Sequence, residues 1–169
     1  HTMAGLAVAL MEANSEEFRQ YSEQTVDNAR TLAAALTERG FSLSSGGTDN
    51  HLILIDVTPK GVTGKQMSKS LDAAGIVCNF NRIPFDSRPP ANPSGIRIGT
   101  PAVTSRGFGP EEMVQLAEWM ARVAGARGDA GLSLEERRKV YQEVAAEVQA
   151  LCDRFPAPGL AYDENEKIL

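Results

Sequence analysis

One arginine, Arg97, stands in a short apolar run, between Ile96 and Ile98 and with Gly95 and Gly99 on its flanks. In a strand, successive side chains point to opposite faces, so the two isoleucines are expected to face a core while Arg97 points the other way. A guanidinium keeps its charge and matches a carboxylate or phosphate with two parallel hydrogen bonds. The pattern therefore predicts either an anion-binding arginine or a surface arginine on an edge strand.

The segment before this arginine carries further polar groups that could bind a small molecule. It runs from Asn79 to Pro93 and contains four prolines. Each proline fixes φ and restricts the residue before it, so a stiff loop is expected. A loop of this length in a compact domain is commonly functional. Asn79 and Asn81 are its candidates for polar recognition.

Other kinds of chemistry are not supported by the residues present. The chain has no G-x-G-x-x-G, P-loop, H-E-x-x-H or nucleophile-elbow motif. Asp49, His51 and Asp56 could be imagined as metal ligands, but Asp49 is better explained by a turn and His51 by the start of a strand. Cys78 and Cys152 are far apart, and no base is visible beside Cys78. We therefore expect no catalytic residue and no metal site in this chain.

Composition describes an ordinary single domain. Of 169 residues, 42% are hydrophobic and 23% charged, and the net charge is −5. The sequence has no basic patch and no apolar run long enough for a membrane span, so neither nucleic acid nor a membrane is an expected partner. Two unpaired cysteines are typical of a cytoplasmic protein.

The periodicity of apolar residues and the positions of glycine, proline and capping residues predict the helices and strands that must position Arg97. Helices are expected at 2–11, 15–39, 64–74, 110–124 and 133–154, and strands at 41–45, 51–57, 76–78 and around Arg97. Capping boxes are expected at Asn14 with Glu17, at Thr63 with Gln66 and at Ser133 with Glu136. Residues 102–108 are predicted to be a loop and 125–131 a linker. This order predicts an α+β fold, with a small mixed or antiparallel sheet of three or four strands covered by helices.

The two ends of the chain differ from this middle part. Residues 2–11 are apolar nearly all round, which predicts a helix that packs against another body. The chain after Phe155 contains proline and glycine and then becomes acidic, which is typical of a loose tail.

Three stretches of sequence carry a resemblance to a known family. Residues 45–52 read S-G-G-T-D-N-H-L, residues 63–65 read T-G-K, and residues 94–108 read S-G-I-R-I-G-T-P-A-V-T-S-R-G-F. In this order and spacing they closely resemble serine hydroxymethyltransferase, also called glycine hydroxymethyltransferase. The resemblance runs from His1 to about Pro156. The family consists of fold-type I pyridoxal-phosphate enzymes that interconvert serine and glycine and pass the one-carbon unit to tetrahydrofolate.

The resemblance implies a division of the chain. It covers only the C-terminal part of the enzymes in this family. Residues 1–14 would therefore be the end of the connecting helix of the large domain, 15–156 the small domain and 157–169 a loose acidic tail. The partners implied are the N-terminal large domain and a second copy in a homodimer.

The resemblance also implies roles for particular residues. Arg97 would bind the α-carboxylate of serine or glycine. Asn81 matches the family position that contacts the folate pterin. Arg88, Pro89 and Pro90 match a folate-side loop, although the sequence of this loop differs from the one usual in the family.

The cofactor is expected to lie mainly outside this chain. The family holds pyridoxal 5'-phosphate through a Schiff-base lysine in the large domain, and no matching lysine motif occurs here. The chain alone is therefore expected to be inactive, with tetrahydrofolate as a co-substrate of the assembled enzyme. Arg106 is expected to anchor the loop beside Arg97, with a role in the site itself as the alternative. The alternative interpretation is a standalone, non-catalytic α+β module that binds an amino acid or another protein.

Overall fold

The computed structural model describes residues 1–158, so most of the predicted tail at 157–169 lies outside the described residues. The helices are α1 (Thr2–Ala13), α2 (Glu16–Glu38), α3 (Gly64–Ala73), α4 (Pro101–Ser105), α5 (Pro110–Gly128) and α6 (Leu134–Arg154), with a 3-10 turn at Thr58–Lys60. The strands are β1 (Ser42–Leu43), β2 (Leu52–Asp56), β3 (Asn79–Asn81) and β4 (Gly95–Gly99).

The four strands form one antiparallel sheet in the order β1-β2-β4-β3. This confirms the predicted α+β class and the small sheet. The strand that carries Arg97 is β4, and it is central because β2 pairs along one side of it and β3 along the other. Arg97 therefore does not lie on an edge strand.

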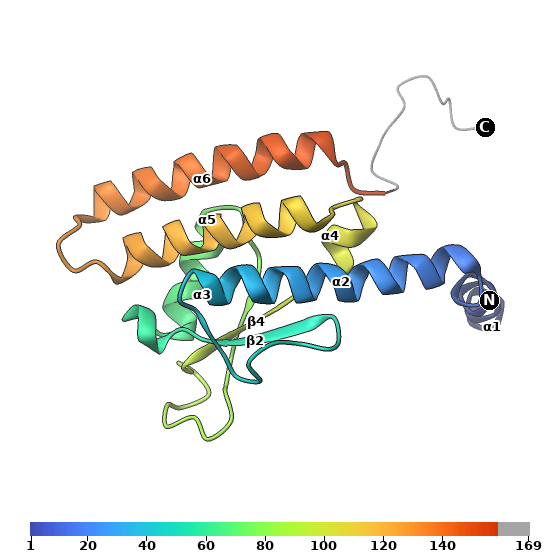
Figure 1. Cartoon of the computed structure of the whole chain (residues 1–169), viewed down its shortest axis with the longest axis horizontal. Helices are drawn as coiled ribbons and strands as arrows, with labels where there is room; N and C mark the ends of the chain where they lie inside the picture. Colours follow the sequence, from blue (N-terminus) through green and yellow to red (C-terminus); the bar gives the residue numbers. More distant parts are fainter. Residues whose placement is uncertain (159–169) are drawn as a thin grey trace.

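The helices cover one face of this sheet. Ile53 and Ile55 of β2 and Ile96 and Ile98 of β4 are buried on that face. Helices α2 and α3 contact the strands, α5 packs on both of these helices, and α6 lies outside α3 and α5. Figure 1 shows the helices stacked on one side of β2 and β4. The opposite face carries no helix in the part of the chain that the structure describes.

The helix caps agree with the sequence at three places and differ at one. Capping boxes form at Thr63 and at Ser133 as predicted. Gly40 follows α2 with φ 74°, the left-handed conformation expected there. Asn14 was wrongly predicted as an N-cap: it ends α1, and the extended residue Ser15 caps α2 by accepting the Phe18 N–H at 3.1 Å.

Three other predicted segments differ from the structure in type or extent. Residues 76–78 form no strand, because the Ile76 N–H bonds back to Leu71 O at the end of α3, and pairing with β4 begins only at Asn79. Residues 102–108 are not all loop, since Pro101 begins the short helix α4. Helix α5 also continues to Gly128, through most of the predicted linker.

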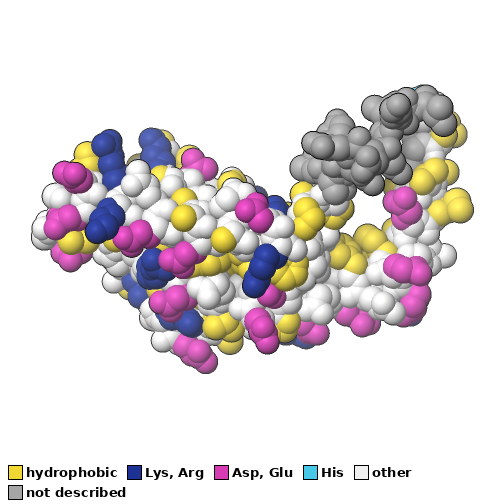
Figure 2. All heavy atoms as spheres, turned by 90° about the horizontal axis from the view of Figure 1, so that it is seen from above, with side chains coloured by type: hydrophobic (Ala, Val, Ile, Leu, Met, Phe, Trp, Pro, Cys, Tyr) yellow, Lys and Arg dark blue, Asp and Glu magenta, His cyan; other side chains and the backbone are white. Residues whose placement is uncertain are grey.

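Helix α1 projects away from the domain. None of its residues is buried, and Met3 and Met11 are 84% and 75% exposed. Figure 2 shows yellow hydrophobic side chains on this arm at the right-hand end of the molecule. The apolar surface that the sequence predicted is present, and within residues 1–158 nothing covers it. Across the same residues, no helix combines the length and the apolar character needed to cross a membrane.

Candidate functional site

The candidate site is the uncovered face of the sheet, with Arg97 at its centre. In the register of the sheet, Arg97 lies opposite Leu54 of β2 and opposite Asn79 of β3. Its neighbours Ile96 and Ile98 are buried on the other face, as the alternation predicted, and Arg97 itself is exposed. No hydrogen bond or ion pair to another residue in 1–158 engages its guanidinium. The sheet therefore presents a charged fork with donors available for a ligand.

Asn81 joins the same face one row further along. It lies opposite Gly95, two residues from Arg97 along β4, so the two side chains are diagonal neighbours about 7–8 Å apart by the geometry of an antiparallel pair. Asn81 is half-buried, and its Nδ2 donates to Arg82 O at 2.9 Å. Its Oδ1 accepts no hydrogen bond from the described residues. Asn79, which the sequence also suggested, lies directly opposite Arg97.

Gly95 makes this arrangement possible. A Cβ atom at this position would lie 2.6 Å from Ile83 Cγ2 and 2.9 Å from Ile55 O. Real Cβ atoms do not approach so closely, so a larger residue would displace the chain beside Asn81. Gly95 therefore lets the loop between β3 and β4 close down on the sheet.

The other predicted folate residues lie on that loop. Arg88, Pro89 and Pro90 are all exposed, between β3 and β4. The Arg88 N–H donates to Asp86 Oδ1 at 2.9 Å. No hydrogen bond or ion pair in the described residues joins these three side chains to Arg97 or Asn81. The sheet register places Arg97, Asn79 and Asn81 on one face, and the other three residues lie on the loop that follows β3.

Two residues of this loop were missed from the sequence. Asp86 is buried, and the N–H and hydroxyl of Ser94, together with the N–H groups of Arg88 and Ile83, hold the pKa of its carboxyl well below its usual range. Phe85 has φ 57°, and its ring is fully exposed. An aspartate two residues after a proline is a weak turn signal, and the sequence did not show that its partner is Ser94, eight residues later.

The structure also shows the surroundings of the residues that the sequence offered as weaker candidates for a metal ligand or a nucleophile. Asp49 and His51 are exposed beside a turn that Thr48 and Asn50 stabilise through their side chains. Burial raises the pKa of the Cys78 thiol to about 11, so this cysteine is a poor nucleophile. No cluster of three possible metal ligands occurs in residues 1–158.

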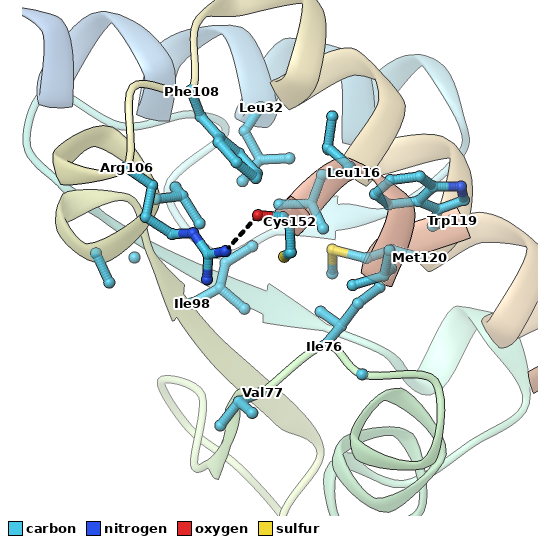
Figure 3. A pocket seen from close by; sticks show the side chains of 16 residues that line it. Leu32, Ile76, Val77, Ile98, Arg106, Phe108, Leu116, Trp119, Met120 and Cys152 are labelled. Carbon is cyan, nitrogen blue, oxygen red and sulfur yellow. Dashed lines mark hydrogen bonds between the residues drawn. The ribbon is translucent and has the colours of Figure 1, made fainter. Parts of the chain in front are cut away.

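A separate cavity of about 350 Å³ lies on the helix side of the sheet, away from the face that carries Arg97. Its lining is almost entirely apolar and comes from α2, β4, α4, α5, α6 and the segment after α3 (Figure 3). The Arg106 guanidinium lies at its edge, where Nε donates to Phe155 O at 2.7 Å and Nη2 to Cys152 O at 2.9 Å. These bonds tie the end of α4 to the end of α6, which is the contact of a structural anchor.

The lysines bear on whether these residues fit pyridoxal phosphate. In residues 1–158 none of the four lysines lies on a strand of the sheet: Lys60 follows β2, Lys65 and Lys69 lie on α3, and Lys139 lies on α6. Lys60 is engaged, because its Nζ donates to Arg39 O and lies over the Phe41 ring. The face with Arg97 therefore presents a guanidinium but, among these residues, no lysine amine.

Comparison with known proteins gives a consistent result. The family model for serine hydroxymethyltransferase matches residues 1–120. Curated proteins named serine hydroxymethyltransferase are 56% identical in Acidothermus cellulolyticus, 56% in Sorangium cellulosum and 54% in Desulfotalea psychrophila. Each alignment covers 95% of this chain but only 36–37% of the relative. The chain thus spans little more than a third of the length of these relatives.

Proposed function

Because the chain belongs to the serine hydroxymethyltransferase family, we propose that it is the C-terminal portion of a pyridoxal-phosphate-dependent enzyme that interconverts serine and glycine with tetrahydrofolate. In this proposal residues 1–14 end a connecting helix of the large domain and 15–156 form the small domain. The large domain and a second copy of the enzyme would be its partners.

The observation that carries the proposal is the position of Arg97. Its guanidinium is exposed on a face that no described helix covers, while the backbone on both sides is fixed by pairing with β2 and β3. Such a fork binds a carboxylate or a phosphate with two parallel hydrogen bonds. Serine and glycine both carry a carboxylate, so Arg97 is assigned to the substrate α-carboxylate.

The folate assignment follows from neighbouring positions. Asn81 shares the face with Arg97 and offers an amide oxygen to a donor on the pterin ring. Arg88, Pro89 and Pro90 are exposed on the loop that continues from β3, where they would bound the same co-substrate. The described lysines do not fit the cofactor, so the lysine that forms the Schiff base is assigned to the part of the enzyme beyond these residues.

Substitution of Arg97 by lysine in the complete enzyme tests the proposal. A point charge would replace a bidentate fork on the open face of a central strand, so the KM for serine should rise about 30- to 100-fold, and the Kd for glycine should rise similarly. The KM for tetrahydrofolate should change less than about threefold. Steady-state kinetics with each substrate varied, together with glycine titration, measure these effects.

The matched control is Arg138→Lys on the exposed face of α6, which should leave both KM values unchanged. Normal serine kinetics in Arg97→Lys would show that the arginine does not bind the carboxylate.

A further inference from the structure

The loop at 82–94 joins β3 to β4 and is fastened by one carboxylate, Asp86, which is only 8% exposed. Its Oδ2 accepts the N–H of Ser94 at 2.9 Å and, at a longer 3.4 Å, that of Ile83. Its Oδ1 accepts the N–H of Arg88 at 2.9 Å and the Ser94 hydroxyl at 2.7 Å. These donors come from the start, the middle and the end of the loop, so this one side chain ties the three parts of the loop together.

An ionised carboxylate suits this position because it only accepts hydrogen bonds, and all of its neighbours here donate. Bonds from N–H groups to an ionised acceptor are stronger than neutral ones. The amide of an asparagine would replace one oxygen by NH2. Whichever way that amide turned, its NH2 would face at least one backbone N–H of Ile83, Arg88 or Ser94.

The backbone of Phe85 has a conformation that a bulky residue disfavours, so the rest of the loop must hold it there. Among residues 1–158 it is the one non-glycine residue with positive φ, at 57°, and its side chain is completely exposed. A bulky residue keeps this conformation only where the surrounding structure imposes it. The exposed ring has no packing that could do so, so hydrogen bonds around it hold this conformation. The Asp86 N–H donates to Ile83 O at 3.1 Å, and the Asp86 carboxylate accepts N–H groups on both sides of Phe85.

Arg97 has supports that Arg88, Pro89 and Pro90 of the loop lack. Arg97 is fixed by strand pairing on both sides, with Leu54 and Asn79. Arg88, Pro89 and Pro90 have no strand partner. We call the Asp86 carboxylate and its hydrogen-bond donors on Ile83, Arg88 and Ser94 the clamp. The Arg82 guanidinium donates to Asp86 O at 3.0 Å, and Asn81 Nδ2 donates to Arg82 O, so the clamp also reaches the end of β3. Loosening the clamp should therefore move the folate side of the site and leave the carboxylate side in place.

We propose that Asp86 is a positioning residue that holds loop 82–94 and thereby sets the affinity of the enzyme for tetrahydrofolate without affecting its affinity for serine. The inference rests on the proposed function for the identity of the ligand. The clamp itself stands on the hydrogen bonds of the loop.

The experiment compares Asp86→Asn, the milder Ser94→Ala and the control Ser87→Ala in the complete enzyme. Ser87 is exposed in the same loop, and its side chain makes no hydrogen bond with the described residues. In Asp86→Asn the amides of Arg88 and Ser94 should exchange about tenfold faster with deuterium, because their acceptor is lost or weakened. The KM for tetrahydrofolate should rise about five- to tenfold, while the KM for serine stays within about twofold. Ser94→Ala should show smaller changes in the same direction, and Ser87→Ala none.

Unchanged amide exchange in Asp86→Asn would overturn the clamp, whatever the function of the protein. Faster exchange with an unchanged folate KM would overturn the positioning role, provided that Asn81→Ala and Arg88→Ala do weaken folate. Equal rises in both KM values would show a general loss of structure and also overturn it. If neither Asn81→Ala nor Arg88→Ala changed the folate KM, the folate assignment in the proposed function would fail, separately from the clamp.

Discussion

Glu147 illustrates how single side chains join the helices that stand behind the site. Its carboxylate on α6 accepts the Trp119 indole N–H at 2.6 Å and two hydrogen bonds from Arg122 Nη1 at 2.7 and 2.8 Å, both on α5. Hydrogen bonds from Arg122 and then Trp119 lower the pKa of the Glu147 carboxyl. The folded state therefore favours the ionised form over the protonated one.

Glu147→Gln should consequently have a pH-dependent effect on stability. A carboxyl whose pKa is lowered by folding contributes stability above its unfolded pKa, about 4.3, and this contribution is lost as pH falls through the folded value. Because the side chain is 42% exposed, screening limits the loss at pH 7 to about 1 kcal/mol. Urea unfolding of the wild type and the variant should show this difference in the free energy of unfolding at pH 7 and little difference near pH 2.5.

Glu143→Gln is the matched control, since Glu143 meets the same arginine only at 3.9 Å and should cost less than about 0.3 kcal/mol. A gap for Glu147→Gln that is equally large at both pH values would contradict the electrostatic explanation.

At the scale of elements, the site depends on how closely α3 approaches β4. The Gly64 N–H at the start of α3 donates to Pro93 O at 2.8 Å. A Cβ atom on Gly64 would overlap Gly95 O and lie 3.0 Å from Pro93 O. Since both obstacles are backbone atoms of the segment leading to Arg97, neither can move without shifting the strand.

Gly64→Ala should therefore destabilise the chain by about 3 kcal/mol, through overpacking at a rigid contact. Gly125→Ala in α5 is the control, because no atom lies within 4 Å of the added methyl group and alanine favours a helix. It should be neutral or stabilise the chain by up to about 1 kcal/mol. Thermal and urea unfolding measure both, and equal stabilities of the two variants would contradict the close-approach argument.

At the scale of the whole molecule, the described residues separate into a packed body and a projecting helix. The core includes Leu36, Met67, Val123 and Val144, so α2, α3, α5 and α6 share one apolar interior. Helix α1 contributes no buried residue to it. Its apolar surface is available for another body, which the proposed large domain would provide.

Removal of residues 1–13 should thus leave the free energy of unfolding of the remaining chain within about 0.5 kcal/mol of the original, since no core contact is lost. It should also reduce self-association at high concentration, because Met3, Leu6 and Leu10 no longer face water. Urea unfolding and light scattering check the two effects. A large loss of stability on truncation would mean that α1 is part of the folding unit.

Sequence alone determined features whose partners lie close along the chain. The alternation of Ile96, Arg97 and Ile98 fixed which face Arg97 would occupy, because side chains of a strand alternate whatever the strand pairs with. The capping boxes at Thr63 and Ser133 were predictable because both partners lie within three residues. The motifs around Arg97 also carried the family resemblance.

Tertiary structure decided the features whose partners lie far apart in sequence. The position of β3 depends on pairing Asn79 with Arg97, eighteen positions later, so apolar character at 76–78 misplaced the strand. The placement of Asn81 beside Arg97 follows from the same register. The role of Asp86 depends on where loop 82–94 returns Ser94 to its carboxylate. Burial and hydrogen-bond partners are properties of the folded chain, and local pattern cannot supply them.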